Sequence, residues 1–137
     1  MPVTAYLQGF SLFSSFTSSV SSYQVSVRAV KLDSFGNKYI AGNFDISATI
    51  KNTTITGNSK DIFISKLDPQ GNPIWVTTAG GAGSDQAMDI ELDDQGGVYV
   101  SGLFSSTATF SGDTIVSAVQ PSANAVTMSD NFLAKYD

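Results

Sequence analysis

The sequence predicts an all-β fold made of two copies of one strand-rich unit, and three observations support this prediction. Apolar residues recur at every second position in several short segments, which is the spacing typical of strands. Asp and Gly recur together between these segments, where a pair of strands would turn. The stretches 28–50 and 88–110 match without a gap at an offset of 60.

The match between the two copies is the strongest of these observations, because internal repeats decide the architecture. The identical pairs are Leu32/Leu92, Asp33/Asp93, Gly36/Gly96, Tyr39/Tyr99, Gly42/Gly102, Phe44/Phe104, Ala48/Ala108 and Thr49/Thr109. The match resumes at 61–68 (DIFISKLD) against 130–137 (DNFLAKYD), at an offset of 69. The additional residues of the second copy lie around Ser117–Ser129, a Ser-, Ala- and Asn-rich stretch that we expect to form a surface loop.

We expect up to four antiparallel strands in each copy, named A to D in chain order. The expected ranges are 25–32 and 86–92 for A, 38–44 and 98–104 for B, 61–67 and 131–136 for C, and 73–78 for D. An Asp-x-x-Gly turn separates A from B in both copies, since Asp can bond the backbone of a turn and Gly can adopt positive φ. Several strands are apolar on both faces, which indicates a sheet covered on both sides. Four such strands describe a β-propeller blade.

Three motifs extend this interpretation. Leu32–Phe44 follows LDxxGxxYxxGxF and recurs at Leu92–Phe104, Asp61–Trp75 follows DxFxxKLDxxGNxxW, and Gly80–Asp85 reads GGxGSD. In this order the motifs resemble the SBBP repeat family of β-propellers, from about Val27 to the C-terminus. The resemblance implies a propeller and implies no activity, because that family is known mainly by its repeat. Tyr136 departs from the pattern, as Leu is usual there.

We therefore predict an N-terminal arm over 1–24, a first blade over 25–85, and a second blade over 86–137 that lacks its last strand. The arm includes Tyr6–Phe16, which is aromatic-rich and uncharged and precedes strand A as a strand D would. Its Ser-rich part, Ser11–Ser22, is interpreted as an ordered segment packed on a neighbour, because Phe10, Phe13, Phe16 and Tyr23 are too apolar for a linker.

The order D–ABCD–ABC describes an incomplete ring, and two blades alone leave faces uncovered. In one interpretation copies of the chain associate head to tail, so that three copies give six blades or four give eight, within the ~4–8 blades usual for propellers. In the other, the chain is a fragment and the remaining blades belong to a longer chain. The two interpretations carry equal weight.

The composition excludes several classes of function. The chain has no His and no Cys, so Ser–His triads, Cys nucleophiles, disulfides and thiolate metal sites are excluded. Only 7 Lys and Arg are present against a net charge of −5, which argues against nucleic-acid binding. No apolar run approaches the ~20 residues that span a bilayer. The N-terminus lacks the basic and apolar regions of a signal peptide.

A few residues are weighed as site candidates. Four acidic residues gather near the start of the second copy, at Asp85, Asp89, Asp93 and Asp94. A Ca²⁺ site is conceivable there, but turn formation explains Asp93 better, because Asp33 recurs at the same place in the first copy. The segment Gly80–Ser84 looks superficially like a phosphate loop and is interpreted as a linker, since the Lys that should follow is missing.

Aromatic residues and one sequon complete the candidates. Trp75 could line a sugar site but is interpreted as a packing residue, and Tyr39 and Tyr99 are expected in the core because they occupy repeat positions. Asn52–Thr54 is a glycosylation sequon, meaningful only in a eukaryotic secretory setting.

We therefore expect no catalytic, cofactor or metal residues and no enzymatic activity. The expected function is structural or interaction: a scaffold or adhesive module, extracellular or on the cell surface, with a virion as the alternative location. The alternative function is a carbohydrate-binding, lectin-like propeller with shallow sites between blades that bind surface glycans.

Overall fold

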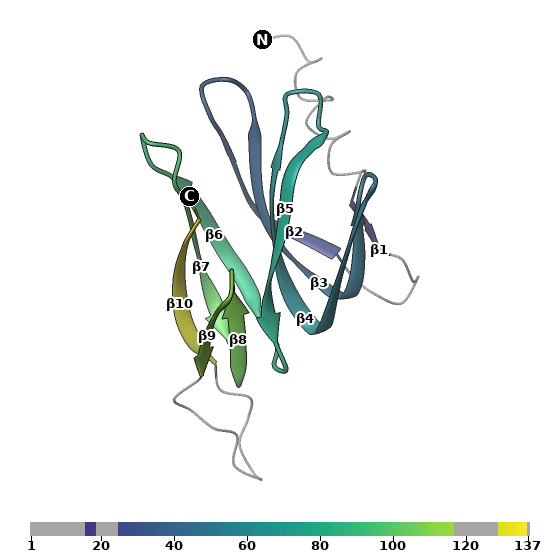
Figure 1. Ribbon diagram of the computed structural model, residues 1–137, viewed down its shortest axis with the longest axis vertical. Coiled ribbons are helices and arrows are strands. Elements are labelled where there is room, and N and C mark those ends of the chain that lie inside the picture. Colours follow the sequence, from purple (N-terminus) through teal and green to yellow (C-terminus); the bar gives the residue numbers. More distant parts are fainter. Residues whose placement is uncertain (1–15, 19–24, 117–128, 137) are drawn as a thin grey trace.

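The computed structural model describes residues 16–18, 25–116 and 129–136. These residues form ten strands and no helix, in two antiparallel sheets, and neither sheet closes on itself (Figure 1). The all-β prediction is therefore confirmed. The larger sheet contains seven strands and the smaller one three.

The first unit consists of four strands that pair in chain order. They are β2 (Val25–Leu32), β3 (Lys38–Ile50), β4 (Thr53–Leu67) and β5 (Pro73–Gly81). All four predicted strands of the first copy are present, and β2 has the predicted limits. Three short strands complete this sheet: β1 (Phe16–Ser18), β8 (Thr107–Phe110) and β9 (Asp113–Val116).

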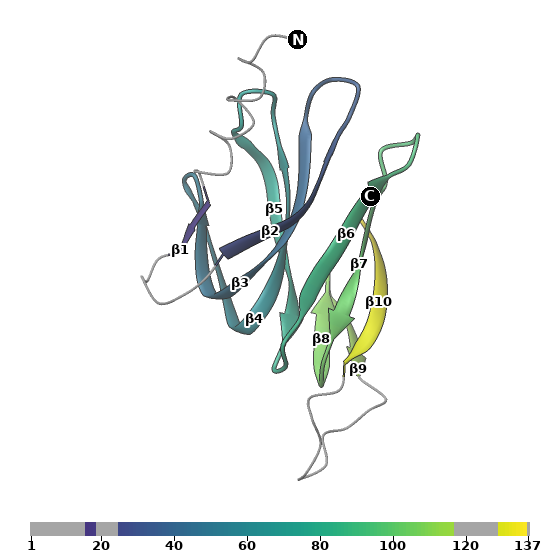
Figure 2. The ribbon, with the colours of Figure 1, turned by 180° about the vertical axis from the view of Figure 1, so that it is seen from behind.

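The second unit is the smaller sheet. Its strands are β6 (Gln86–Leu92), β7 (Val98–Phe104) and β10 (Asp130–Tyr136), in the order β10–β7–β6. Strands β6 and β7 have the predicted limits. In both views β10 lies on the side of β7 away from the first unit (Figures 1 and 2). Only β7 pairs with β10 among the described strands, so β10 is the edge of this sheet.

Strands B and C of the first unit are longer than predicted. Strand B was predicted to end at Phe44 and strand C to begin near Asp61, whereas β3 and β4 continue as one hairpin to a turn at 51–52. A register shift between Asp45 and Ser47, with Ile46 at a φ of 63°, bends β3 and then lets the pairing resume. The β-branched residues beyond that bend favour a strand.

The matching residues of the second copy form two separate strands, β7 and β8, instead of one continuous strand. Ser106, which aligns with Ile46, has a φ of 65°, and the chain leaves the second sheet there. It then forms the β8–β9 hairpin, which joins the larger sheet by pairing with the end of β5. One hairpin of the second copy is thus added to the sheet of the first, and the sequence pattern did not predict this exchange.

Strand β1 takes the same position toward the first hairpin. It pairs with the end of β3 in the register Phe16↔Ile50, and the end of β5 pairs with β8 in the register Ala79↔Phe110. Ile50 and Phe110 align at the offset of 60. Strand β1 is therefore placed like the end of a strand D that precedes the first unit. The rest of the predicted arm 1–24 and residues 117–128 of the predicted insert loop lie outside the described residues.

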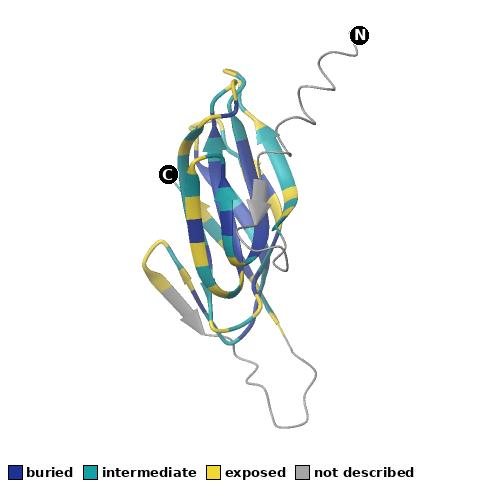
Figure 3. Ribbon diagram, turned by 90° about the vertical axis from the view of Figure 1, so that its right-hand side faces the viewer, coloured by how far each residue is buried: buried dark blue, intermediate teal, exposed yellow. Residues whose placement is uncertain are grey.

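Two apolar clusters bury the faces of the first unit. One packs the first unit against the second and includes Ile62 and Ile64 from β4 with Ile90 and Val100 from the smaller sheet. The other lies on the opposite face of the first unit and contains Phe44 and other buried apolar residues of β3 and β4. Buried residues run along the strands in the middle of the molecule (Figure 3). The first unit is therefore buried on both faces, as the run of apolar residues predicted.

Candidate functional site

The aspartates predicted to form turns do so. The backbone N–H groups of Phe35 and Asn37 both donate to Asp33 Oδ1 at 2.9 Å. Asp68 and Asp93 hold their turns in the same way, with Asn72 N donating to Asp68 Oδ1 at 2.7 Å. Desolvation raises the pKa of Asp33, but hydrogen bonds from the side chain and backbone of Asn37 outweigh it and lower that pKa. Hydrogen bonds from the side chain and backbone of Asn72 lower the pKa of Asp68, and backbone hydrogen bonds lower that of Asp93, in both cases against a smaller effect of desolvation. The turn interpretation of Asp33 and Asp93 is confirmed.

The acidic cluster at 85–94 does not converge on one point. Asp85 is buried at the junction of the two units, whereas Asp93 closes the β6–β7 turn and Asp89 lies on the exposed side of β6. Across residues 16–18, 25–116 and 129–136, no three acidic side chains are grouped as metal ligands. Asp85 instead forms a pair with Asp61, a residue that was not among the predicted site candidates.

Asp61 and Asp85 share one backbone donor. Gly81 N donates to Asp61 Oδ1 at 3.2 Å and to Asp85 Oδ2 at 2.9 Å. Asp61 also accepts from Asn58 N at 2.9 Å, and Asp85 from Ser105 N at 3.2 Å. The two side chains are almost fully buried, at 5% and 0% exposure. The pair therefore fastens β4, the end of β5 and the end of β7 to one another.

The sequence held a signal for this pair in two of the motifs. Asp61 opens DxFxxKLD and Asp85 closes GGxGSD. The glycines follow from the same contact, because a Cβ on Gly80 would lie 2.2 Å from Asp61 Oδ1 and 2.9 Å from Asp85 Oδ2. The segment Gly80–Ser84 joins β5 to β6, as the linker interpretation predicted. Gly80 makes room for the two carboxylates, whereas Gly81 and Gly83 lie against backbone carbonyl groups of the second copy.

Burial raises the pKa of Asp85 to about 6; hydrogen bonds from Ser105 N and Gly81 N oppose this rise, and the nearby Asp61 adds to it. Burial also raises the pKa of Asp61. Such shifts are typical of acid–base sites. Here, however, the carboxylate oxygens accept backbone hydrogen bonds that hold two units together. The arrangement is suited to fastening the junction.

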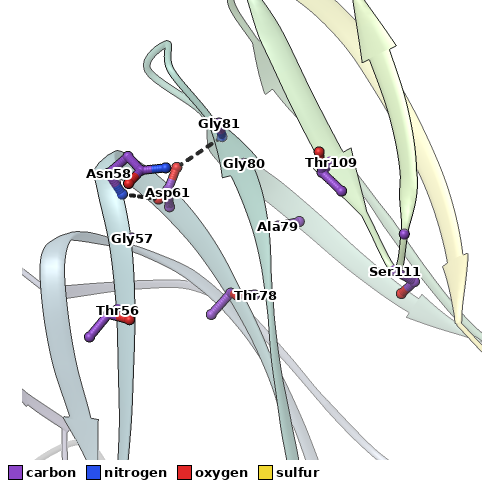
Figure 4. A pocket seen from close by; sticks show the side chains of 11 residues that line it. Thr56, Gly57, Asn58, Asp61, Thr78, Ala79, Gly80, Gly81, Thr109 and Ser111 are labelled. Atoms are coloured by element: carbon purple, nitrogen blue, oxygen red, sulfur yellow. Dashed lines mark hydrogen bonds between the residues drawn. The ribbon is translucent and has the colours of Figure 1, made fainter.

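A polar cavity of about 280 Å³ adjoins Asp61 (Figure 4). It lies between the first unit and the β8–β9 hairpin. Its lining is composed of small residues, hydroxyl groups and amides: Thr56, Gly57, Asn58, Asp61, Thr78, Ala79, Gly80, Gly81, Thr109, Ser111 and Gly112. No aromatic side chain is among the described residues that line it. The cavity is therefore suited to a small hydrogen-bonding ligand and offers no stacking platform.

Trp75 and the two tyrosines lie elsewhere. The Trp75 and Tyr39 rings meet edge to face with centroids 6.3 Å apart, and Trp75 packs against the core between the units. Tyr39 is buried, as predicted. Tyr99 is only half-buried, so its assignment to the core was wrong: its face of the second unit is not covered by any described strand. Asn52 of the sequon is exposed in the turn between β3 and β4.

The outward face of the second unit, which is the side of its sheet turned away from the first unit and carries Leu133, differs from the equivalent face of the first unit. Ile64 of β4 is fully buried beneath the second unit, whereas Leu133, which aligns with it at the offset of 69, is 72% exposed. Met88 of β6 is also exposed. An ion pair crosses between the units at the rim, where Lys31 Nζ lies 2.6 Å from Glu91 Oε1. The outward face of the second unit is thus exposed to solvent, whereas the equivalent face of the first unit is buried.

Comparisons with known proteins add no relative to these findings. No family model matches the sequence, and no curated protein and no solved structure matches it either. The part of the chain that the structure describes contains no helix that could cross a bilayer.

Proposed function

We propose that this chain is a non-enzymatic β-propeller module with a structural or interaction role. One observation carries the proposal: the outward face of the second unit exposes Leu133 and Met88, whereas the corresponding face of the first unit is buried by packing against the next unit. A solvent-facing apolar group of this kind is typical of an interaction surface. The proposed role is that of a scaffold or adhesive component, extracellular, at a cell surface or in a virion.

The composition of the face supports an interface rather than a core. Leu103, Tyr99 and Ser101 are partly buried on it, and Leu133 and Asn131 are exposed, so that apolar and polar side chains alternate. Interfaces between separately folded units combine apolar and polar groups in this way. The motif resemblance to SBBP-repeat propellers supports the same conclusion, since propeller blades pack face to face.

Sedimentation velocity over a range of concentrations tests this proposal. The wild-type chain is expected to associate as its concentration rises, and Leu133→Asp is expected to weaken association at least tenfold. Ile74→Asp is the matched control, because Ile74 is a similarly exposed apolar residue of the first unit at 54% exposure. A wild-type chain that stays monomeric, or equal effects of the two variants, would contradict a role for this face.

The cavity favours carbohydrate binding as a second candidate function. Its hydroxyl and amide groups, with the Asp61 carboxylate, are the kinds of partner that sugar hydroxyls bond. A glycan array followed by titration calorimetry tests this candidate. Saturable binding that Thr56→Val weakens, and that Thr54→Val on the exposed hairpin does not, would support it. Absence of saturable binding would exclude it.

A further inference from the structure

We propose that the cavity beside Asp61 binds an amino sugar, whose protonated amine lies against the Asp61 carboxylate and whose hydroxyl groups bond the polar lining. This inference rests on the second candidate function, carbohydrate binding, and names the class of sugar. It requires a site of the right size, a carboxylate at its wall that lacks a positively charged partner, and hydroxyl or amide groups around it. The described residues provide all three.

The cavity is small and its walls are held by strand pairing. Its volume of about 280 Å³ lies just below the ~300–1,000 Å³ of pockets for drug-sized ligands. It therefore suits a single sugar ring better than an oligosaccharide. The walls come from β4, the end of β5 and the β8–β9 hairpin (Figure 4). Because β5 pairs with both β4 and β8, these walls are fixed relative to one another before a ligand binds.

Asp61 and Asp85 have no positively charged side chain beside them. All 7 Lys and Arg residues of the chain lie in the part that the structure describes, and none of them forms an ion pair with Asp61 or Asp85. Carboxylates as buried as these, at 5% and 0% exposure, are usually paired with a cation. A cation supplied by a ligand would fill that role.

The two carboxylates also act unfavourably on each other. They share Gly81 N as a hydrogen-bond donor, so their oxygens lie close together. Burial is the main cause of the raised pKa of Asp85, and the nearby Asp61 raises it further, as two like charges do. A cation at the cavity wall would offset this repulsion. Only Asp61 of the pair lines the cavity, so it is the carboxylate that a ligand can reach.

Two glycines leave the Asp61 carboxylate open to the cavity. A Cβ on Gly57 would lie 2.0 Å from Asp61 Oδ2, and one on Gly80 would lie 2.2 Å from Oδ1. Both glycines line the cavity, so no side chain at these positions separates the carboxylate from it. Backbone N–H groups of Asn58 and Gly81 bond the carboxylate. A carboxylate has ~four acceptor positions, so it can also accept from an ammonium group.

The donor set of the cavity suits an ammonium group better than a metal ion. Ca²⁺ takes ~6–8 oxygen ligands, with several carboxylates among them. Across residues 16–18, 25–116 and 129–136 no three acidic side chains are grouped as metal ligands, and Asp61 alone lines the cavity. An ammonium group has three N–H donors and is satisfied by one carboxylate and two neutral oxygens.

The rest of the lining is suited to the hydroxyl groups of a sugar. Thr56 comes from β4, Thr78 from β5 and Ser111 from the turn between β8 and β9, and Asn58 adds an amide (Figure 4). Hydroxyl groups both donate and accept, as those around a sugar ring do. No Lys or Arg is among the described lining residues, so an acidic sugar would meet Asp61 without a compensating charge. The lining therefore favours a sugar that is neutral or positive.

A series of matched ligands tests the charge with the wild-type chain. Titration calorimetry at neutral pH, with a chelator present, compares glucosamine with N-acetylglucosamine and glucose. Glucosamine is expected to bind ~tenfold or more tightly than either, since only its amine forms a charge-assisted hydrogen bond with Asp61. Butylamine carries the amine without the sugar hydroxyl groups and is expected to bind ~tenfold more weakly than glucosamine.

A charge variant tests the residue. Asp61→Asn is expected to weaken glucosamine binding ~tenfold or more and to change N-acetylglucosamine binding little. Asp94→Asn is the matched control, because it removes the same charge from an exposed turn of the second unit. Circular dichroism shows whether both variants are folded. The ligand series decides the inference even if Asp61→Asn does not fold, since it uses the wild-type chain.

The outcomes separate this inference from the carbohydrate candidate. If the three sugars bind equally, the cavity binds carbohydrate without reading charge, and the inference fails alone. If none binds, the carbohydrate candidate fails with it, while the role proposed for the outward face is unaffected. Butylamine that binds as tightly as glucosamine would contradict recognition of the sugar. A preference for glucosamine that Asp61→Asn abolishes and Asp94→Asn retains supports the inference.

Discussion

Asp85 shows how much one buried side chain contributes to the junction of the two units. Its carboxylate accepts from Gly81 N and Ser105 N, which belong to different units, and it is fully buried. A buried carboxylate with only N–H donors around it is favourably bonded when charged, but desolvation disfavours the charge. Desolvation is the larger effect here, since the pKa is raised to about 6.

This balance predicts a stability that decreases as the pH rises from 4 to 7. A raised pKa means that the folded state binds more protons than the unfolded state between the ordinary carboxyl pKa and about 6, so the free energy of unfolding falls across this window. We expect a loss of ~1–2 kcal/mol across this window. Urea unfolding at several pH values measures it.

Asp85→Asn is expected to reduce this pH dependence, and Ser105→Ala is the control, because it retains the backbone donor to Asp85. Asp61 keeps part of the slope, since its pKa is also raised. Asp33, Asp68 and Asp93 act in the opposite direction: their lowered pKa values remove stability only below about pH 4. An unchanged slope in Asp85→Asn would show that Asp85 is not the group that titrates.

At the scale of elements, local chemistry predicted the strands and turns, while their partners followed from tertiary packing. The Asp-x-x-Gly pattern determined the turns because Asp33 and Asp93 bond their own backbone, and Gly36 and Gly96 adopt φ values of 82° and 91°. The β8–β9 hairpin has the same local pattern as its counterpart at 45–56. Its attachment to β5 is a backbone pairing of Ala79 with Phe110 and of Gly81 with Ala108, residues distant in sequence, so no local pattern could predict it.

Gly42 and Gly102 provide an element-scale prediction about strand packing. A Cβ on Gly42 would lie 2.3 Å from Ser26 O, and one on Gly102 would lie 2.0 Å from Gln86 O. Because backbone atoms cannot move aside cheaply, Gly42→Ala and Gly102→Ala are each expected to destabilise the fold by ~2–3 kcal/mol. Gly96→Ala is the control, since a Cβ there meets nothing within 4 Å and costs only the strain of positive φ, ~1 kcal/mol.

Thermal and urea unfolding of these three variants measures the difference. Equal losses for Gly42→Ala and Gly96→Ala would mean that the strands relax around the added methyl group. Because Gly42 and Gly102 recur at the same place in both copies, similar losses at the two positions would also show that each sheet needs the same close approach.

At the scale of the whole molecule, the two units are unequal in what covers them. The first unit is buried on both faces and its strand β4 is paired on both edges. The second unit has one buried face, and its strand β10 is paired on one edge among the described residues. The sequence alone predicted an incomplete set of strands. The equivalence of β1 and the end of β5 is seen only in their strand pairing, because their sequences have nothing in common.

This inequality predicts hydrogen exchange that depends on concentration in one strand only. If a second copy adds to β10, half of the backbone N–H groups of β10 exchange quickly in dilute solution and become protected as the chain associates. The amides of β4 are an internal reference, since both of their neighbours are in the same chain and their protection is independent of concentration. Mass spectrometry of peptides covering 61–67 and 130–136 measures both. Protection of β10 that is equally strong at low and high concentration would contradict the association, because intermolecular hydrogen bonds must be lost on dilution.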